Sequence, residues 1–324
     1  MTYAIQLDQF GGPEVLAWRE IDIPALQPGM VLVSQQAIGL NFIDTYHRSG
    51  LYPLELPAGL GVEAAGIVEA VGDGVDTISV GDRVAYVGLP PGAYAEKRIF
   101  PADRLVKLPD EISTETAAGA MLKGLTAWYL LRRSFPVTAG QHILLYAAAG
   151  GVGLIAAQWA ASIKAHVIGV ASTDEKAALA KQNGCEHVVR SDDPDFVSHV
   201  RELTDGTGVA AVYDSVGKES FFQSLDCLQP HGMMVTYGNA SGAVEPFSPM
   251  ELARRGSLLL TRPVIFDFIR ARSDLLAAAA ELFGLLQAGS INININQTYP
   301  LQEAARAHVD LEARKTTGSV VLIP

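Results

Sequence analysis

The chain has 324 residues, of which 49% are hydrophobic and 18% charged, and its formal net charge is −11. This composition excludes an intrinsically disordered chain, and the acidic charge argues against nucleic acid as a partner, because a nucleic-acid-binding surface needs a basic face. The length suits two domains with separate cores, no apolar run approaches the roughly 20 residues that cross a bilayer, and no export signal is expected at the N-terminus.

The chain has two cysteines, Cys185 and Cys227. They are too few for a disulfide framework and are typical of a reducing compartment. We interpret both as small core hydrophobes. The sequence therefore predicts a cytoplasmic protein with no membrane partner.

Short strands punctuated by glycine and proline dominate the first 120 residues. We expect them at residues 3–7, 16–23, 31–40, 64–71, 83–87 and 93–99. Glycine and aspartate at 72–74 and 81–82 have the composition of hairpin turns. This pattern predicts a mainly β, twisted, partly antiparallel and barrel-like domain. A long helical stretch at 114–135 then leads into the second half of the chain.

The small-residue segment at 147–153 is the most informative motif. An apolar run at 141–146 predicts a buried strand before it, and the run at 154–163 predicts an apolar helix after it. A turn of this kind lets the backbone approach a pyrophosphate, and the helix N-terminus supplies N–H groups and the positive end of the dipole. The alternative is a tight turn that serves close packing alone. The candidate cofactor-binding residues of the turn are Ala148, Gly150, Gly151, Val152 and Gly153, with alanine where the GxGxxG pattern has its first glycine.

Further apolar runs follow and alternate with helical patterns. The runs are at 166–172, 186–191, 209–216, 233–238 and 257–263, and the clearest helices are at 174–183 and 195–204. Because parallel strands need crossovers, this alternation predicts an α/β, doubly wound parallel sheet of the Rossmann type. Ligands in such sheets bind at the carboxyl ends of the strands.

The end of the second strand of this sheet bears on the choice of dinucleotide. A carboxylate there usually binds the ribose of NAD, but the position is Ala171, followed by Ser172, Thr173 and Lys176. Hydroxyl groups and a lysine would hold a 2′-phosphate that a carboxylate would repel. An ordinary solvated helix lysine is the alternative for Lys176. The pattern favours NADPH (NADP+) over NADH.

Three charged residues nearby modify this interpretation. Arg190, at the end of the third strand, offers a second positive charge for the phosphate. Asp174 and Glu175 oppose it, although both also suit the dipole of the helix that they begin.

The C-terminal part of the chain contains two helical blocks, at 274–288 and 304–314, and an apolar strand at 319–324. We expect this last strand to return to the N-terminal domain. The predicted division is therefore a catalytic domain of residues 1–124 and 267–324 and an NADPH-binding domain of residues 125–266. The run at 257–263 would form the edge of the nucleotide-domain sheet, and an apolar edge strand favours pairing into a homodimer.

Seven short motifs carry a family resemblance that spans essentially the whole chain. They are NFID at 41–44, GVEAAG at 61–66, GDRV at 81–84, KGLTA at 123–127, AAAGGVG at 147–153, DSVG at 214–217 and TGSVVL at 317–322. In order and spacing the chain resembles the medium-chain dehydrogenase/reductase superfamily. Within it the chain is similar to the zinc-free quinone oxidoreductases of the zeta-crystallin type, above all the bacterial NADPH:quinone oxidoreductases. The resemblance implies a GroES-like catalytic domain, a Rossmann domain and a symmetric dimer.

The zinc ligands of the related alcohol dehydrogenases are missing. Those enzymes have a cysteine near the position of Asn41 and a histidine at the position of Val62. Asparagine and valine cannot replace thiolate and imidazole in a tetrahedral zinc site, and there is no cluster of four cysteines for a structural zinc. We therefore expect no metal and no oxidation of simple alcohols, whose alkoxide needs a Lewis acid.

A quinone is electrophilic enough to accept a hydride without a metal, so the expected reaction is quinone reduction by NADPH. The predicted catalytic residues are Asn41, which resembles the active-site asparagine of the family, and Tyr46 and Tyr52. A tyrosine offers a flat apolar face to a quinone ring and an O–H to its oxygen. The alternative for each tyrosine is an ordinary packed residue. Asp44 and Glu63 resemble family positions that anchor the wall of the site.

Other cofactor contacts are predicted from the strand ends and from the resemblance. They are Asn41, Thr126, Ser191, Ser215, Val216, Gly238, Asn239 and Arg314. Lys123 either approaches the nicotinamide or is a solvated lysine at a helix end. The histidines show no spacing typical of metal ligands or of a triad, and His47 alone lies near the predicted catalytic residues.

Two other functions remain open at this point. One is an NADPH-dependent reductase of α,β-unsaturated aldehydes or ketones, which would use the same hydride donor on another acceptor. The other is a nucleotide-binding regulatory protein without enzymatic activity. The sequence does not separate quinone from enone.

Overall fold

The computed structural model describes residues 1–324, which form two compact units. The first comprises Met1–Lys123, Ile269–Gln287 and Ile293–Pro324, and the second comprises Gly124–Phe268 and Ala288–Asn292. The boundary after residue 123 falls within helix α2 (Thr114–Tyr129), which continues as a π-helical turn, η3 (Leu130–Ser134). None of the helices combines the length and the apolar character that a membrane crossing requires.

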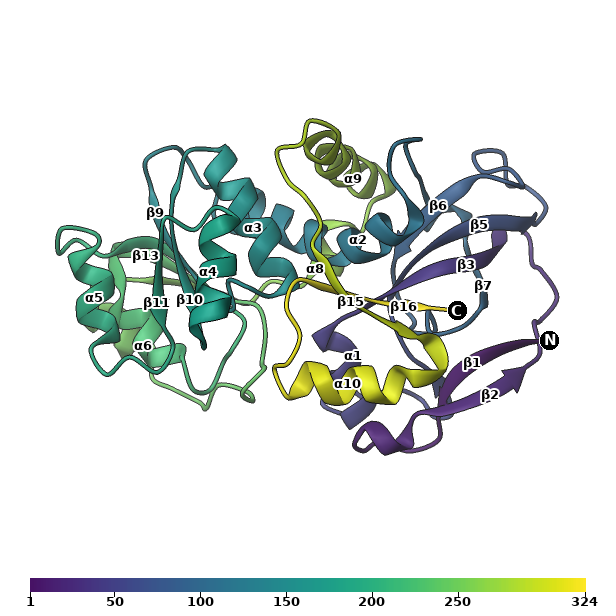
Figure 1. The fold of residues 1–324 in the computed structure, drawn as a ribbon, viewed down its shortest axis with the longest axis horizontal. Helices are drawn as coiled ribbons and strands as arrows, with labels where there is room; N and C mark the ends of the chain where they lie inside the picture. The colour runs from purple at the N-terminus through teal and green to yellow at the C-terminus, as the bar shows by residue number, and fades with distance from the viewer. The chain divides into compact units, whose positions relative to one another are not determined.

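The first unit is built on a seven-stranded sheet with the order β15-β16-β3-β5-β6-β8, to which β7 adds by pairing with β3 (Figure 1). A second sheet of three strands has the order β2-β1-β4. The strands are β1 (Thr2–Leu7), β2 (Ala17–Ile21), β3 (Met30–Leu40), β4 (Ala58–Gly59), β5 (Glu63–Val71), β6 (Arg83–Val87), β7 (Lys97–Pro101), β8 (Val106–Lys107), β15 (Ile295–Pro300) and β16 (Ser319–Ile323). The helices are α1 (Phe42–Ser49), α9 (Arg272–Gln287) and α10 (Ala304–Glu312), with 3-10 turns η1 (Pro13–Val15), η2 (Ala102–Arg104) and η4 (Leu301–Glu303).

The longest strand, β3, organises this unit because it pairs antiparallel with β5, β7 and β16. Its inward residues, among them Val31, Val33 and Ile38, are fully buried in one core with Tyr86 and Phe100. The pairing of β16 with β3 confirms that the C-terminal strand returns to the N-terminal part of the chain.

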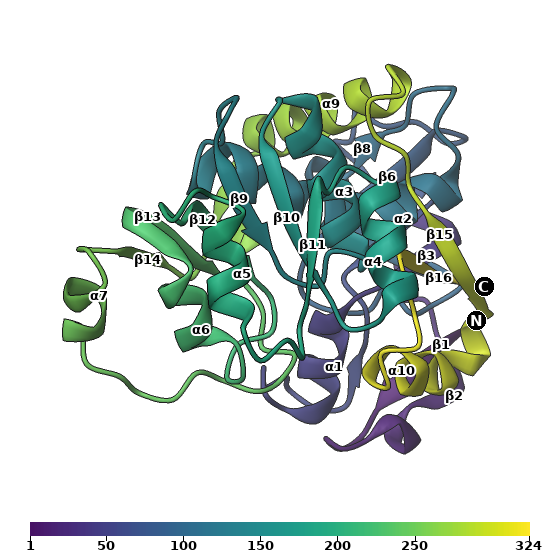
Figure 2. The ribbon, with the colours of Figure 1, turned by 60° about the vertical axis from the view of Figure 1, so that its left-hand side comes forward.

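The second unit is a six-stranded parallel sheet with the order β11-β10-β9-β12-β13-β14. Its strands are β9 (His142–Leu145), β10 (His166–Ala171), β11 (His187–Arg190), β12 (Val209–Asp214), β13 (Leu228–Thr236) and β14 (Leu259–Thr261). Its helices are α3 (Gly151–Ser162), α4 (Asp174–Gln182), α5 (Phe196–Glu202), α6 (Phe221–Asp226), α7 (Met250–Arg254) and α8 (Ile265–Phe268). Helices α3 and α4 lie on one face of the sheet, and α5 and α6 lie on the other (Figures 1 and 2).

The predicted doubly wound sheet and mainly β domain are therefore confirmed, as is the position of the run at 257–263 at a sheet edge. The strand expected at 93–99 is wrong in its position, because β7 begins only at Lys97. Residues 92–94 bond instead to Leu60 and Gly61, through three backbone hydrogen bonds of 2.8 to 3.0 Å. The side-chain amide of Gln35 donates to the carbonyls of Ala93 and Ala95, and an isolated antiparallel bridge joins Ala95 to Ala4 of β1. Strand β15 was not expected.

Candidate functional site

The small-residue turn of the second unit connects β9 to α3, as predicted. Ala147 adopts a left-handed conformation with φ +50°, and Gly150 is the N-cap of α3. A Cβ at Gly153 would collide with the carbonyl oxygen of Ala147 and lie 2.8 Å from the Cα of Ala148. Only glycine lets the first turn of α3 lie this close to the end of β9.

The N-terminus of α3 suits an anionic ligand. No side chain caps this helix, and its first turn contains no acidic residue. The first N–H groups of a helix have no intrahelical acceptor, so an anion such as a pyrophosphate can bind them and also gains from the dipole. The next helix differs, because Thr173 Oγ1 accepts the N–H of Lys176 at 3.2 Å and Asp174 and Glu175 occupy the first turn of α4. The residues of the α3 turn therefore fit the diphosphate of a dinucleotide.

Residues predicted to select NADPH gather where β10 and β11 end. Ala171 is the last residue of β10, and Thr173 caps the helix that follows. Arg190 Nη1 lies 2.7 Å from Asp174 Oδ1, and its Nη2 lies 3.1 Å from Asp192 Oδ2. Two carboxylates thus balance the charge of Arg190, whereas the sequence predicts this charge to bind a phosphate directly. Lys176 is half-buried in the first two turns of α4.

A buried carboxylate shapes the loop after β12. Asp214 Oδ1 accepts the N–H groups of Val216 at 2.7 Å and of Gly217 at 3.2 Å, and Oδ2 accepts the hydroxyl groups of Ser220 and Ser224. Burial raises the pKa of Asp214 while these hydrogen bonds oppose the rise. The loop carries the predicted contacts Ser215 and Val216. The sequence alone assigns no role to Asp214, although this residue opens the DSVG motif.

The predicted contact Gly238 follows β13 and lies directly against the end of β12. A Cβ at this position would come within 2.5 Å of the carbonyl oxygen of Ser215. Asn239 follows it and is half-buried. The structure therefore brings these predicted residues to one region at the carboxyl ends of the sheet, where Ser191 also follows β11.

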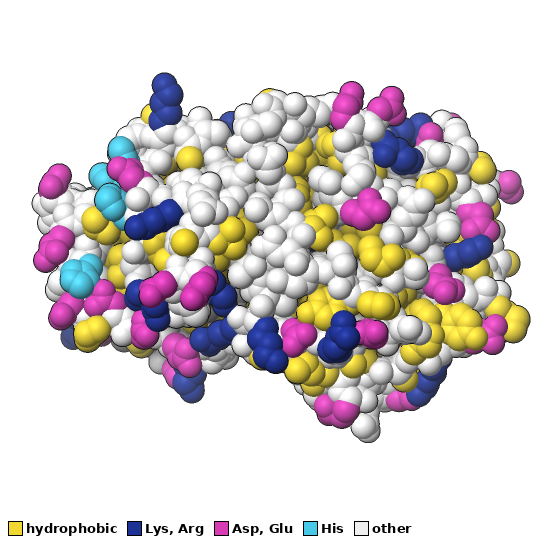
Figure 3. Space-filling view, in the orientation of Figure 1, with side chains coloured by type: hydrophobic (Ala, Val, Ile, Leu, Met, Phe, Trp, Pro, Cys, Tyr) yellow, Lys and Arg dark blue, Asp and Glu magenta, His cyan; other side chains and the backbone are white.

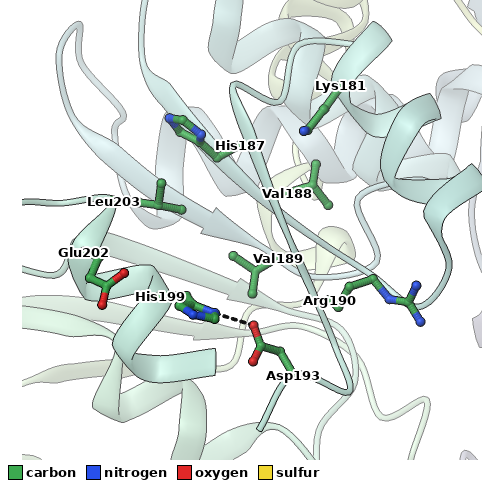
Figure 4. A pocket seen from close by; sticks show the side chains of 9 residues that line it. All are labelled: Lys181, His187, Val188, Val189, Arg190, Asp193, His199, Glu202 and Leu203. Carbon is green, nitrogen blue, oxygen red and sulfur yellow. Dashed lines mark hydrogen bonds and ion pairs between the residues drawn. The ribbon is translucent and has the colours of Figure 1, made fainter. Parts of the chain in front are cut away.

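A pocket of about 350 Å³ lies elsewhere in this unit, along the edge strand β11 (Figure 4). Lys181 of α4 and His199 of α5 line it, and Asp193 Oδ2 lies 2.5 Å from His199 Nδ1. Of the predicted cofactor residues it includes Arg190, but it does not include the α3 turn.

In the first unit, the predicted active-site asparagine begins α1. Asn41 is the N-cap, its N–H donates to Asp44 Oδ2 at 2.9 Å, and the two residues form a capping box. Its side-chain Nδ2 donates to Glu63 Oε2 at 2.8 Å and to the carbonyl of Gly39 at 3.2 Å. These bonds fix both the backbone and the side chain of Asn41, which is 7% exposed.

Lys123 pairs with Glu63 in the interior of this unit. Its Nζ lies 3.6 Å from Glu63 Oε2, and both side chains are buried. Gly39 leaves room for this arrangement, since a Cβ there would collide with the Glu63 carboxylate and with the carbonyl of Ala118. Burial raises the pKa of Glu63, and the Lys123 cation and the hydrogen bond from Asn41 oppose the rise. A solvated lysine at a helix end, one of the two interpretations above, is therefore wrong.

The tyrosines that we predict to be catalytic lie next to each other. The ring centroids of Tyr46 and Tyr52 are 5.2 Å apart in an edge-to-face arrangement, and the N–H of Tyr52 donates to the carbonyl of Tyr46 at 3.0 Å. Both are half-buried. His47 packs edge-on against Tyr52 at 6.0 Å, and burial lowers its pKa to about 4.

Two further predicted contacts belong to different units. Thr126 is buried in α2 on the side of the boundary that belongs to the second unit. Arg314 lies in the first unit, in the exposed turn after α10, and has a left-handed φ of +58°.

The remaining histidines form no metal site. Histidine side chains gather on the face of the second unit seen in Figure 3. The rings of His142 and His166 stack with their centroids 4.7 Å apart, and His166 Nδ1 lies 2.6 Å from Glu186 Oε2. These residues are at the amino ends of their strands, opposite the α3 turn. No group of three or more histidine, cysteine, aspartate or glutamate side chains is arranged to hold a metal ion.

Comparisons with known proteins agree with this architecture. Residues 27–110 match the alcohol dehydrogenase GroES-like domain, and residues 151–283 match the family described as zinc-binding dehydrogenase. A quinone oxidoreductase of Pseudomonas aeruginosa is 50% identical over 325 residues, which cover 100% of both chains. A 2-haloacrylate reductase of a Burkholderia species is 44% identical over 331 residues, covering 100% of this chain and 99% of the relative.

The fold of a solved relative is nearly the same. The crystal structure of Escherichia coli quinone oxidoreductase complexed with NADPH superposes with a TM-score of 0.98 at 46% identity, covering 99% of this chain and 100% of that one. These similarities confirm the resemblance that the motifs carry. The chain belongs to the quinone oxidoreductase family of the medium-chain dehydrogenase/reductase superfamily.

Proposed function

We propose that this protein is an NADPH:quinone oxidoreductase, an enzyme that reduces quinones with NADPH without zinc. The observation that carries the proposal is the uncapped N-terminus of α3 behind its small-residue turn, in a chain similar over its full length to a quinone oxidoreductase crystallised with NADPH. NADPH, when bound, supplies the hydride, so the protein has to bind and orient the cofactor and the quinone and to exclude water from them.

The second unit binds most of the cofactor in this proposal. Gly150, Gly151, Val152 and Gly153, with Ala148, hold the diphosphate through backbone N–H groups. Ser172, Thr173 and Lys176 hold the 2′-phosphate. Arg190 assists by binding Asp174, whose carboxylate would otherwise repel that phosphate. The other proposed contacts are Thr126, Ser191, Ser215, Val216, Gly238, Asn239 and Arg314.

The first unit acts on the nicotinamide and the quinone. Asn41, fixed by Asp44 and Glu63, orients the nicotinamide end of the cofactor. With NADPH and a quinone bound, Tyr46 and Tyr52 would pack against the quinone ring, and the O–H of one of them would donate a hydrogen bond to a quinone oxygen. We assign residues 1–124 and 267–324 to this catalytic role and residues 125–266 to NADPH binding.

The proposal includes a homodimer in the cytoplasm. β14 is an edge strand on which Leu259 and Leu260 are 53% and 36% exposed, and such an edge is suited to pairing with a second copy. The two buried free thiols, at Cys185 and Cys227, fit a reducing compartment.

The test is the oxidation of NADPH and NADH with an acceptor panel of 1,4-benzoquinone, 9,10-phenanthrenequinone, an alkenal and 2-chloroacrylate. We expect turnover with the quinones and a clear preference for NADPH. Turnover only with the alkenal or the haloacrylate would replace quinone reduction with reduction of an activated carbon–carbon double bond. NADPH binding without any turnover would favour a regulatory role.

Two variants test the tyrosines within the same assay. Tyr46→Phe and Tyr52→Phe should leave NADPH binding intact and change quinone turnover. Wild-type rates for both variants across the pH range would show that neither hydroxyl is an essential proton donor.

A further inference from the structure

A line of buried polar side chains crosses the first unit and ends at Asn41. Its members are Arg48 on α1, His308 on α10, Tyr94 in the segment between β6 and β7, and Asp44 on α1. None of these four side chains is more than 3% exposed. Buried polar groups of this kind must be matched donor to acceptor, so the direction of each hydrogen bond can be worked out.

The direction is set at Arg48, because a guanidinium can donate but cannot accept. Arg48 donates to the carbonyl of Gly11 at 3.1 Å and to both carboxylate oxygens of Glu312 at 2.9 and 2.7 Å. Its Nη1 also lies 3.0 Å from His308 Nδ1, which must therefore be the acceptor. Burial and the Arg48 charge lower the pKa of His308 to about 3. The ring is neutral at physiological pH, and its hydrogen is on Nε2.

The remaining bonds continue in the same direction. His308 Nε2–H faces Tyr94 Oη at 3.1 Å, and the Tyr94 hydroxyl donates to Asp44 Oδ2 at 2.9 Å. The same oxygen accepts the backbone N–H of Asn41, while Asp44 Oδ1 has no partner. All the donors thus converge on one oxygen of the carboxylate that holds Asn41 at the start of α1.

We propose that Tyr94 and His308 are positioning residues for Asn41, acting through Asp44. They hold the Asp44 carboxylate in one orientation, and this carboxylate holds the N-cap whose side chain orients the nicotinamide. The inference rests on the role proposed above for Asn41. Removing the Tyr94 hydroxyl leaves Asp44 with one protein donor, and displacements of about 1 Å in a catalytic site can cost up to a hundredfold in rate.

The first test is Tyr94→Phe, with Tyr86→Phe as the matched control. Tyr86 is equally buried in the same unit, and its hydroxyl donates to Gln35, whose amide in turn holds the carbonyls of Ala93 and Ala95 on either side of Tyr94. Tyr86→Phe therefore disturbs the packing around Tyr94 but removes no donor to Asp44. Hydrogen exchange of the Asn41 amide in the protein without cofactor should be about tenfold faster in Tyr94→Phe. Tyr86→Phe should leave this rate unchanged. Equal rates at Asn41 in wild type and Tyr94→Phe would overturn the inference, whatever the enzyme's activity.

Kinetics supply the second readout. Tyr94→Phe should lower kcat about tenfold to a hundredfold, with little change in the KM for NADPH, and should raise the primary isotope effect of NADPH deuterated at the transferred position. The acid limb of the pH profile should also move to higher pH, since Asp44 loses a hydrogen bond to its ionised form. Lys123 and Glu63, the other charged groups that act on Asp44, are unchanged in this variant. An equal loss of kcat in Tyr86→Phe would show that the loss in Tyr94→Phe comes from disturbed packing, and it would overturn the positioning role.

A pair of substitutions at His308 tests the direction of the line. Glutamine places its amide nitrogen where histidine has Nε2 and so keeps the donor to Tyr94, whereas asparagine mimics Nδ1 and keeps only the acceptor for Arg48. We expect His308→Gln to retain wild-type kcat and Asn41 exchange, and His308→Asn to resemble Tyr94→Phe. Equal effects of the two substitutions would overturn the inference. Even if Tyr94→Phe does not fold, this pair tests whether a donor at the position of His308 Nε2 is needed to position Asn41.

Asn41→Ala separates failure of this inference from failure of the proposed function. Wild-type kcat and isotope effect in Asn41→Ala would show that the role proposed for Asn41 is wrong, and the kinetic part of the inference would fail with it. An impaired Asn41→Ala together with unaffected Tyr94→Phe and His308→Asn would leave the proposed function intact and reject the positioning role alone.

Discussion

Lys123 and Glu63 form a charged pair in the interior of the first unit. The Glu63 side chain is fully buried and the Lys123 side chain is 8% exposed, so both charges have lost most of their hydration. The attraction between them, together with the hydrogen bonds from Asn41 and the N–H of Leu122, compensates for this loss. Neither partner is stable in this place without the other.

Glu63→Gln should therefore destabilise the protein strongly, by about 3–5 kcal/mol, because it leaves the Lys123 charge buried without a counterion. The double variant Glu63→Gln/Lys123→Met should recover part of this loss. Urea denaturation of these two variants, of the single variant Lys123→Met and of the wild type measures both effects. Additive losses in the double variant would show that the two side chains do not interact.

The pH dependence of stability tests the neutral state of His308. Its pKa is lowered to about 3 by burial, so between about pH 3 and 6.5 the unfolded chain binds a proton that the folded chain does not, and this contribution to stability rises with pH. Asp44 acts in the opposite sense, because burial raises its pKa to about 7 and its contribution falls between about pH 4 and 7. Across the shared window the two effects oppose each other.

His308→Gln should remove only the rising contribution. The free energy of unfolding of the wild type should then increase relative to the variant by on the order of 1 kcal/mol per pH unit between about pH 4 and 6. Urea denaturation at several pH values measures the difference. Parallel curves for the two proteins would mean that His308 titrates normally in the folded state.

At the scale of the element, α3 and α4 both start at the carboxyl end of the parallel sheet. They differ in what accepts hydrogen bonds from the N–H groups of their first turns. α4 has a hydroxyl cap and acidic residues, whereas α3 has neither and begins at glycine. The first turn of α3 is therefore left for a ligand, and its close approach to β9 depends on Gly153.

Gly153→Ala should lower both stability and NADPH affinity, because the new Cβ would force apart the backbones of α3 and the β9 turn. The control is Gly284→Ala in α9, where a Cβ meets nothing within 4 Å. That substitution should stabilise the protein by about 0.5–1 kcal/mol and leave binding unchanged. Fluorescence titration with NADPH and thermal unfolding compare the two variants. Unchanged affinity in Gly153→Ala would contradict the role of this turn.

The same elements show how far the sequence can be interpreted. The strands of the nucleotide unit are short apolar runs, and hydrophobicity alone finds them because both faces of a parallel sheet are buried. β15 escapes that criterion, since its residues alternate in exposure and only Tyr299 is buried. The apolar run at 93–99 misleads this criterion, because residues 93–95 are held by Gln35, by Leu60 and Gly61 and by one isolated bridge to β1 rather than by a continuous strand pairing.

The candidate site divides in a similar way. The residues of the α3 turn are consecutive, and Tyr46 and Tyr52 are only six residues apart, so the sequence alone predicts that each set lies together. His308 and Tyr94 acquire a role only through Asp44, which is more than 200 residues from His308 along the chain, and no local pattern marks such a contact. The buried position of Lys123 could not be predicted, because the sequence does not show that the Glu63 carboxylate faces it.

At the scale of the whole molecule, the proposed association between copies rests on the exposed edge of β14. Leu259, Leu260 and Val264 expose 53%, 36% and 44% of their surfaces on or next to a strand with an unpaired side. An apolar open edge of this kind favours pairing between copies over exposure to water.

Leu259→Lys should therefore convert the proposed dimer to a monomer of 34.4 kDa, because a charged side chain on an edge strand disfavours pairing. Light scattering after size-exclusion chromatography measures the mass. Leu276→Lys, at a residue of α9 that is 38% exposed, serves as the control and should keep the wild-type mass. A monomeric wild type would rule out the proposed association.

The pairing of β3 with β16 has a consequence for synthesis of the chain. Leu40 is synthesised 280 residues (320 − 40) before its partner Val320. At about 5–20 residues per second, this interval lasts roughly a quarter of a minute to a minute. The contiguous segment 124–268 can complete its own sheet during that time, while one edge of β3 waits without its partner. Nascent chains stalled just before residue 319 should therefore hold a protease-resistant nucleotide unit and a first unit that is still open to cleavage.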